Sequence, residues 1–265
     1  MPPSSQPDLP RPSFLTGRII TSLILREMNS TYGRSPGGYV WAVLEPIGMI
    51  VILSVAFSLL VRSPSLGTSF LMFYATGYLP FSIYNEIAAK TAGSLKYSRP
   101  LLAYPRVTWM DAVLARILLN FLTGLTVFCI LISAILYFTG TRVVLDVGRI
   151  LEGIGIAVAT GIGVGLVNCL LGGLFDLWAR VWAIVSRPLF LASGIIYIYE
   201  DLPRSAQAIL WWNPLIHATG QVRSGFYTTY DATYVSLPYA YGLALILSVI
   251  GLLFLRQHYR TILER

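Results

Sequence analysis

The sequence predicts an all-α integral membrane protein with six transmembrane helices, an N-terminal amphipathic interfacial helix and a re-entrant helical hairpin before the last span. Composition gives the first reason. Of the 265 residues, 55% are hydrophobic and 12% are charged, about half of the roughly 25% charged residues of a soluble domain. The second reason is that apolar runs recur along the chain at lengths that cross a bilayer core of about 30 Å. The mean hydropathy of +0.69 agrees with both.

The N-terminal region divides into a tail and an amphipathic segment. Residues 1–13 are rich in Pro and Ser and lack an apolar core, so we expect a disordered cytoplasmic tail and not a signal peptide. Residues 14–35 alternate apolar and basic positions at helical spacing, which is typical of a helix lying in the membrane interface. With the basic turn that follows it, this helix is compatible with the cytoplasmic mouth of a transport path. It is equally compatible with an ordinary amphipathic anchor before the first span.

Residues 36–265 are expected to form the transmembrane domain. Apolar runs lie at about 40–61, 70–87, 116–138, 150–175, 178–199 and 238–255. The fifth run is the least regular, because it contains Arg180 and Arg187. A further apolar patch at 206–216 is too short to span a bilayer, so it is interpreted as a re-entrant or interfacial hairpin.

The basic residues indicate the orientation. The net charge of +7 comes from Lys and Arg scattered over short loops, which the positive-inside rule explains better than binding to nucleic acid. Most of them fall before the first span, after the second and fourth spans, and after the last. We therefore expect both termini in the cytoplasm and no nucleic-acid partner. The loop after the third span, with Arg142 and Arg149, is unusually basic for an outer loop.

Several kinds of chemistry are not indicated by the sequence. The only lysines are Lys90 and Lys96, and neither ends a GxxxxGK loop, so the chain has no ATPase site of its own. His217 and His258 lie far apart without ligand spacing around them, and both cysteines lie within predicted spans, so no metal site is expected. We expect no enzyme activity and no cofactor in this chain.

The fourth span carries small residues at every fourth position. Gly153, Ala157, Gly161 and Gly165 fall on one helix face, which lets another backbone approach closely. The segment Gly161–Gly165 has a superficial likeness to a dinucleotide-binding fingerprint, but it lies in mid-span with no strand before it. We therefore expect a helix-packing face.

The loop after the second span, residues 93–106, mixes aromatic and basic side chains. Its length fits a helix of one or two turns beneath the membrane. Docking to a partner and a plain basic loop that satisfies the positive-inside rule are both compatible with this composition.

Three groups of residues resemble a known family. Leu25-Arg26-Glu27, Tyr32–Ser35, Gly38–Trp41 and Glu45-Pro46 look like the N-terminal signature of ABC-2 type permeases that export polysaccharides. Thr76–Phe81, Tyr104–Val107, Asp111 and Ala115-Arg116 look more specifically like the capsular polysaccharide branch, and Asn213–Leu215 with Arg223 look like the segment before the last span. The resemblance covers about residues 14–260.

The resemblance implies a homodimer of this chain working with two copies of a separate ABC ATPase subunit, which carries the ATP and Mg. It implies a bacterial inner membrane protein that exports a lipid-linked capsular polysaccharide together with a periplasmic co-polymerase and an outer-membrane exporter. It also implies that the amphipathic helix at residues 14–35 is a gate helix. A coupling helix at about residues 94–104 would contact the ATPase through Lys96, Tyr97, Arg99 and Pro100.

A polysaccharide path needs aromatic faces for sugar rings, polar groups for hydroxyls and basic groups where acidic sugars or a lipid phosphate enter. The candidates for this path are Arg26, Arg34, Tyr39, Trp41, Glu45, Tyr78, Tyr84, Trp211 and Trp212. For each aromatic residue, core packing or a place in the interfacial belt is the alternative. For Glu45, an ion pair with an arginine at the mouth is slightly favoured over sugar contact.

Two other functions stay open at this point. Permeases for lipopolysaccharide O-antigen or other polysaccharides share much of the same pattern. A secondary transporter outside the ABC class is a second alternative, although such proteins usually show an internal repeat, which is not apparent between residues 40–138 and 150–255.

Overall fold

The computed structural model describes residues 15–32, 38–102, 107–140 and 144–264, and the regular elements in this part of the chain are all helices joined by loops. The tail predicted at residues 1–13 lies outside the described residues. The helices are α1 (Leu15–Tyr32), α2 (Gly38–Leu60), α3 (Phe70–Ala92), α4 (Ser94–Leu102), α5 (Trp109–Thr139), α6 (Val147–Leu174), α7 (Trp178–Ala192), α8 (Arg204–Leu210), α9 (Pro214–Phe226) and α10 (Leu237–Glu264).

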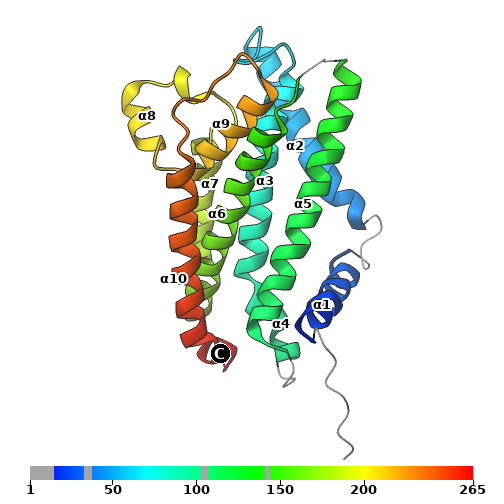
Figure 1. The fold of residues 1–265 in the computed structure, drawn as a ribbon, viewed down its shortest axis with the longest axis vertical. Coiled ribbons are helices and arrows are strands. Elements are labelled where there is room, and N and C mark those ends of the chain that lie inside the picture. The colour runs from blue at the N-terminus through cyan, green and yellow to red at the C-terminus, as the bar shows by residue number, and fades with distance from the viewer. Residues whose placement is uncertain (1–14, 33–37, 103–106, 141–143, 265) are drawn as a thin grey trace, which may run out of the picture.

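The long helices form a bundle with α3 and α6 at its centre (Figure 1). α2 and α5 lie on one side of this centre, and α7 and α10 lie on the other. α1, α4 and the C-terminal turns of α10 gather at one end of the bundle, whereas α8 and α9 lie toward the opposite end. The end that holds α1 and α4 is the one that the sequence predicts to be cytoplasmic.

Four of the described helices are long and apolar enough to cross a membrane, namely α2, α5, α6 and α10. α3 and α7 also run along the bundle axis (Figure 1), but they do not meet this combined requirement of length and apolar character. α3 has 23 residues with Asn85, Glu86 and Lys90 among them, and α7 has only 15 residues, including Arg180 and Arg187. The predicted membrane protein is supported, and the count of six spans stays a prediction.

The small face of α6 lies against two neighbouring helices. A methyl group added at Gly161 would lie 3.0 Å from the Tyr84 carbonyl oxygen, and one at Gly165 would lie 2.7 Å from the Thr91 Cβ, both on α3. At Gly153 it would lie 2.8 Å from the Ala218 carbonyl oxygen on α9. Ala157 on the same face is fully buried. Close backbone approach of α3 and α9 to α6 therefore depends on these small residues.

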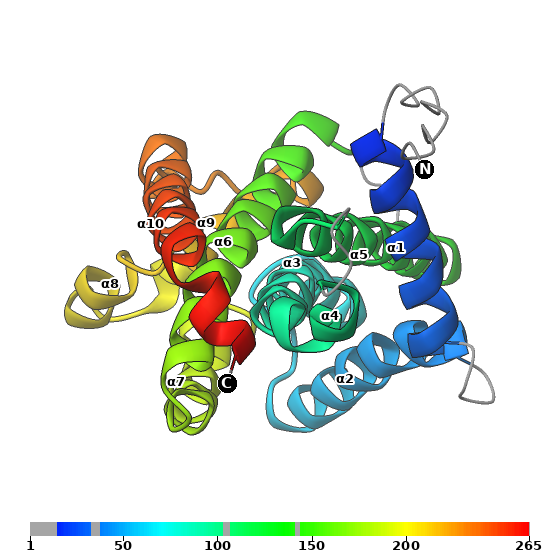
Figure 2. The ribbon, with the colours of Figure 1, turned by 90° about the horizontal axis from the view of Figure 1, so that it is seen from below.

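α1 lies across the end of the bundle. Seen from below, it is drawn at full length, whereas α3 at the centre of the bundle is seen nearly end-on (Figure 2). It packs mainly on α5. This orientation fits an amphipathic helix parallel to a membrane surface.

Two polar motifs fix where helices begin. α5 starts at a capping box in which the Thr108 side chain accepts from the Asp111 amide and the Asp111 carboxylate accepts from the Thr108 amide. α9 starts at Asn213, whose side chain accepts from the Leu215 amide, with Pro214 in the first turn. Both arrangements satisfy amides that a helix leaves unpaired at its start. The segment predicted as a hairpin thus consists of two short helices, α8 and α9, whose depth in a membrane stays a prediction.

Candidate functional site

A cavity of about 210 Å³ lies between α2, α3 and α5. Three predicted path residues line it: Trp41 and Glu45 on α2, and Tyr78 on α3. Trp41 is 61% exposed, so its indole face is available to a ligand. Because Trp41 and Glu45 lie in the first two turns of α2, the cavity belongs to the half of the bundle that is nearer to α1 and α4.

The rest of the cavity wall is unusually polar for an apolar bundle. It includes Asn85, Glu86 and Lys90 on α3 and Asn120 and Thr123 on α5. Carboxylates accept hydrogen bonds, an ammonium group donates them, and amides do both, so together with an aromatic face these groups suit a hydroxyl-rich ligand such as a sugar. Charged groups inside a membrane domain are costly and usually serve function.

Glu45 makes no ion pair within the described part of the chain. Its side chain is exposed and lines the cavity. Arg34, the arginine of the adjoining basic turn, lies outside the described residues, so the expected ion pair at the mouth stays a prediction. The Tyr39 side chain also lies outside them. Arg26 is exposed on α1 and borders a small hollow beside Tyr97.

Tyr84 points to the other side of α3. It lines a second cavity, of about 240 Å³, between α3 and α7, where Phe81 and Trp182 provide further aromatic groups and alanines form much of the wall. Phe81 also borders the first cavity and packs edge-on against Phe190 of α7 at 5.5 Å. α3 therefore separates two hollows, and the predicted path residues Tyr78 and Tyr84 belong to different ones.

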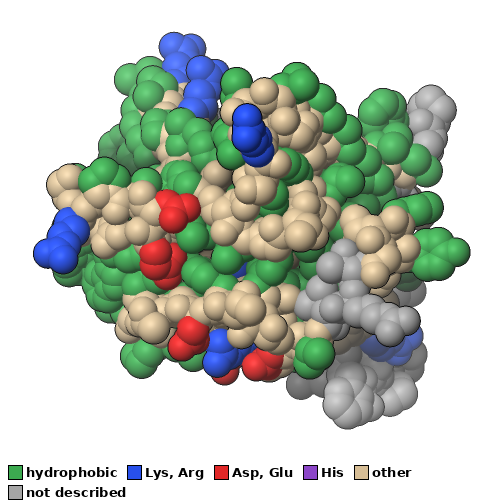
Figure 3. Space-filling model, turned by 90° about the horizontal axis from the view of Figure 1, so that it is seen from above, with side chains coloured by type: hydrophobic (Ala, Val, Ile, Leu, Met, Phe, Trp, Pro, Cys, Tyr) green, Lys and Arg blue, Asp and Glu red, His purple; other side chains and the backbone are tan. Residues whose placement is uncertain are grey.

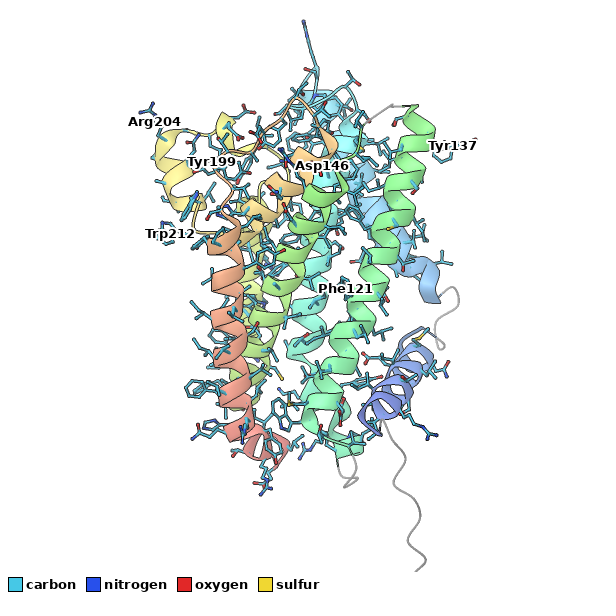
Figure 4. All side chains as sticks on the ribbon, viewed as in Figure 1. Phe121, Tyr137, Asp146, Tyr199, Arg204 and Trp212 are labelled. Atoms are coloured by element: carbon cyan, nitrogen blue, oxygen red, sulfur yellow. The ribbon has the colours of Figure 1, made fainter. Side chains whose placement is uncertain are left out.

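Trp211 and Trp212 belong to a separate aromatic cluster. The Trp211 ring stacks on Tyr239 at 4.7 Å, and its indole nitrogen donates to the Tyr234 carbonyl at 3.1 Å. Trp212 is 66% exposed and lies at the edge of the molecule beside α8, on the side away from α2 and α5 (Figure 4). Within one chain, the structure does not bring these two residues together with Trp41, Glu45 and Tyr78.

His217 holds this aromatic cluster together. The Ser236 amide donates to its Nδ1 at 3.3 Å, so the ring proton resides on Nε2, which donates to the Trp211 carbonyl at 2.8 Å. Burial lowers the pKa of His217, against a smaller opposing effect of the bond to Trp211. A neutral histidine with both nitrogens used inside the protein acts as a structural group. Among the described residues, no three His, Cys, Asp or Glu side chains gather as a metal site requires.

α4 occupies the place predicted for a coupling helix. Leu95 and Ser98 are buried against the bundle, while Lys96, Tyr97, Arg99 and Pro100 are exposed. The helix is thus amphipathic, with a basic and aromatic face turned outward at the end of the bundle where α1 lies. Such a face is available to a partner protein.

Arg116, which the resemblance includes in the pair Ala115-Arg116, joins α4 to α1. Its Nε lies 2.9 Å from the Glu27 Oε1 of α1, and one terminal nitrogen donates to the Lys90 carbonyl of α3 at 3.0 Å. Its guanidinium also covers the Tyr97 ring at 4.0 Å. A basic residue at a predicted span end offered no sign of these contacts.

Arg223 forms a similar buried junction near the opposite end. It donates to the backbone carbonyls of Gly194, Ile195 and Tyr197 at 2.6 to 2.8 Å, and its guanidinium lies 4.1 Å from the centre of the Phe73 ring. These contacts tie α9 to the segment after α7 and to the start of α3. The resemblance marked this residue, but only the structure shows its partners.

Charged residues on the face above α8 and α9 offset one another in part (Figure 3). Arg149 contacts Asp146 at 3.4 Å and Asp231 at 3.1 Å. The positive charge that Arg149 contributes to the loop after the third predicted span is therefore partly balanced by nearby carboxylates. Exposed pairs of this kind contribute little stability.

Comparison with known proteins gives a consistent picture. Residues 19–227 match the family described as ABC-2 type transporter. The chain is 28% identical to the polysialic acid transport protein KpsM of Escherichia coli over 247 residues, which is 92% of this chain and 95% of KpsM. It is 28% identical to the capsule polysaccharide export inner-membrane protein BexB of Haemophilus influenzae over 92% of both chains. It is 26% identical to the capsule polysaccharide export inner-membrane protein CtrC of Neisseria meningitidis serogroup B over 89% of both.

Proposed function

This chain belongs to the ABC-2 type transporter family, and from that premise we propose that it is the transmembrane permease subunit of an ATP-driven exporter of capsular polysaccharide. The observation that carries the proposal is the match along nearly the whole chain to BexB and CtrC, which are named as capsule polysaccharide export inner-membrane proteins, and to KpsM, which is named as a polysialic acid transport protein. The same role for this chain fits its four long apolar helices.

The membrane topology that we propose has six spans, with α3 and α7 added to the four apolar helices. α3 and α7 run parallel to them in the bundle (Figure 1). The polar groups of α3 line a cavity, so they do not all lie on the outside of the bundle. Both termini are proposed to be cytoplasmic, because α1 and the end of α10 lie at the same end as the basic helix α4.

ATP hydrolysis is proposed to take place on a separate ABC ATPase subunit, present in two copies beneath a homodimer of this chain. The exposed face of α4, with Lys96, Tyr97, Arg99 and Pro100, is the proposed contact. A helix of this size, buried on one side and exposed on the other, can pass the movement of a partner into the bundle. A periplasmic co-polymerase and an outer-membrane exporter are the further partners that we propose.

The cavity between α2, α3 and α5 is proposed to contact the polysaccharide. Its Trp41 face suits the apolar face of a sugar ring, and Glu45, Asn85 and Glu86 supply groups that hydrogen-bond to hydroxyls. A volume of about 210 Å³ holds a single sugar unit and not a folded chain. The lipid end of the polymer would remain in contact with the membrane.

The first test is deletion of the gene for this chain in its native host, followed by fractionation of cell-surface glycans. Accumulation of lipid-linked capsule in the cytoplasm, with O-antigen still on the surface, is the expected result. Trapped O-antigen with normal capsule would show that the chain serves a different polysaccharide. Normal export of both glycans would contradict the proposal. Purification of the chain with an ATPase subunit would exclude a secondary transporter.

A further inference from the structure

The guanidinium group of Arg116 contacts residues of three other helices, so the junction around it joins four helices. Arg116 belongs to α5, its ion-pair partner Glu27 belongs to α1, the carbonyl that it binds is that of Lys90 on α3, and Tyr97 beneath it belongs to α4. The side chains of Arg116 and Glu27 are only 8% and 9% exposed. One buried residue, Arg116, therefore contacts both α4, which faces the proposed ATPase, and α1, the proposed gate helix.

Glu27 has a special place on α1. Among residues 17–29, where the structure describes α1 side chains, Glu27 alone is buried. The other side chains in this range are exposed or half-buried against α5. The most deeply buried of the described α1 side chains is therefore a carboxylate held by Arg116.

The geometry of the junction requires arginine. A guanidinium is planar and presents several N–H donors in a fixed arrangement, so it can bind a carboxylate and a carbonyl while its face covers an aromatic ring. A lysine ammonium is a compact point charge and does not make all three contacts at once. Removing one partner of a buried ion pair leaves the other charge without compensation, so loss of Glu27 weakens the junction even where the contacts of Arg116 with the Lys90 carbonyl and the Tyr97 ring are kept.

We propose that Arg116 is a positioning residue that transmits movement of α4 to α1. This inference rests on the proposed function, in which an ATPase moves α4. Displacement of α4 carries Tyr97 with it, and Arg116 follows because its guanidinium covers the ring. The ion pair then draws Glu27 and hence α1, so that the gate helix shifts together with the coupling helix. If the junction only stabilised the fold, the position of α1 would not depend on the nucleotide state of the ATPase.

The test uses the purified complex with its ATPase in proteoliposomes and measures glycan exported per ATP hydrolysed. Coupling between two sites commonly changes the binding affinity at one of them by about 5- to 150-fold, and we take the lower end of this range as the scale of the effect. We therefore expect Glu27→Gln to lower export per ATP at least fivefold while ATP hydrolysis stays within about twofold. Arg116→Lys, which keeps the charge, is expected to do the same.

A second readout follows α1 directly and needs no glycan. In a Cys129→Ser background the remaining cysteine, Cys169, is buried, and Leu25→Cys places a thiol on an exposed position of α1. Maleimide labelling of this thiol is expected to differ between nucleotide-free and vanadate-trapped complexes, and Glu27→Gln is expected to abolish that difference. A control variant, Asp231→Asn, removes the exposed ion pair with Arg149 at the opposite end and is expected to change neither readout.

The two readouts separate the possible failures. Labelling at position 25 that is independent of nucleotide, or unchanged coupling and labelling in Glu27→Gln and Arg116→Lys, would overturn the inference. A wild-type complex that exports no glycan but shows nucleotide-dependent labelling would refute the proposed substrate and leave the transmission from α4 to α1 in place. Reduced yield of folded protein alone changes neither export per ATP nor labelling per folded complex.

Discussion

Replacement of Arg223 by methionine should destabilise the fold strongly. Arg223 is only 2% exposed, and it supplies the donors for the carbonyls of Gly194, Ile195 and Tyr197. Methionine fills most of the space but leaves these three carbonyls without that partner. Hydrogen bonds to charged groups contribute about 1.5–3 kcal/mol each, and burial of the guanidinium offsets several kcal/mol of their sum. Each buried carbonyl left without a donor costs about 1–3 kcal/mol, so we expect a net loss of about 3–5 kcal/mol.

Thermal unfolding of the detergent-solubilised protein measures this effect. At roughly 2–4 °C per kcal/mol for a chain of this size, the apparent Tm of Arg223→Met should fall by about 6–20 °C. Arg204→Met is the matched control, because Arg204 is exposed on α8 (Figure 4) and its loss should change Tm by no more than about 1 °C. Equal Tm values for the two variants would refute the reasoning, since the buried donors would then contribute nothing.

Three further predictions concern packing, the cavity and the partner. Gly165→Val should destabilise the fold by about 1–3 kcal/mol through overpacking and lower Tm. Gly242→Val should leave Tm unchanged, because no atom lies within 4 Å of a methyl group added there. An equal fall in Tm for both variants would contradict the packing role of Gly165. Trp41→Ala should reduce glycan export several-fold in a cell-surface assay at an unchanged rate of ATP hydrolysis, and normal export would remove Trp41 from the path. Combined replacement of Lys96 and Arg99 by alanine should reduce co-purification of the ATPase subunit on an affinity tag, and undiminished recovery would exclude α4 as the main contact.

The apolar pattern predicted the helices well within the bilayer core and less well beyond it. The run at 40–61 corresponds to α2, which spans Gly38–Leu60. In contrast, α5 begins at Trp109 and α10 continues to Glu264, several residues outside the predicted runs at 116–138 and 238–255. Hydropathy detects the part of a helix that contacts lipid. The polar turns that extend into water depend on capping and on contacts with other helices, such as the stacking of Trp109 on Tyr259 at 6.0 Å.

The amphipathic helix, the short basic helix and the small face of α6 were also apparent from local patterns. The partners of Arg116 and Arg223 were not. Glu27 and Arg116 are far apart in sequence, and one sequence considered by itself offers no signal that pairs them. The hydrogen bonds of Arg223 described above all go to backbone carbonyls, which any residue type supplies. Long-range polar contacts of this kind depend on how helices pack, and helix packing is what composition and periodicity leave undetermined.

The two buried arginines give α3 a distinctive role in the bundle. Phe73 near its start lies beneath Arg223, and the carbonyl of Lys90 near its end accepts from Arg116. Fifteen of its 23 residues are buried, whereas no side chain of α7 is buried. Both cavities lie against α3, one shared with α2 and α5 and the other with α7. Because α3 is held at both ends and along its length, a change in the shape of either cavity requires movement of the helices that form the wall opposite α3. Of these helices, α7 has no buried side chain and can therefore move with the smallest loss of buried contacts.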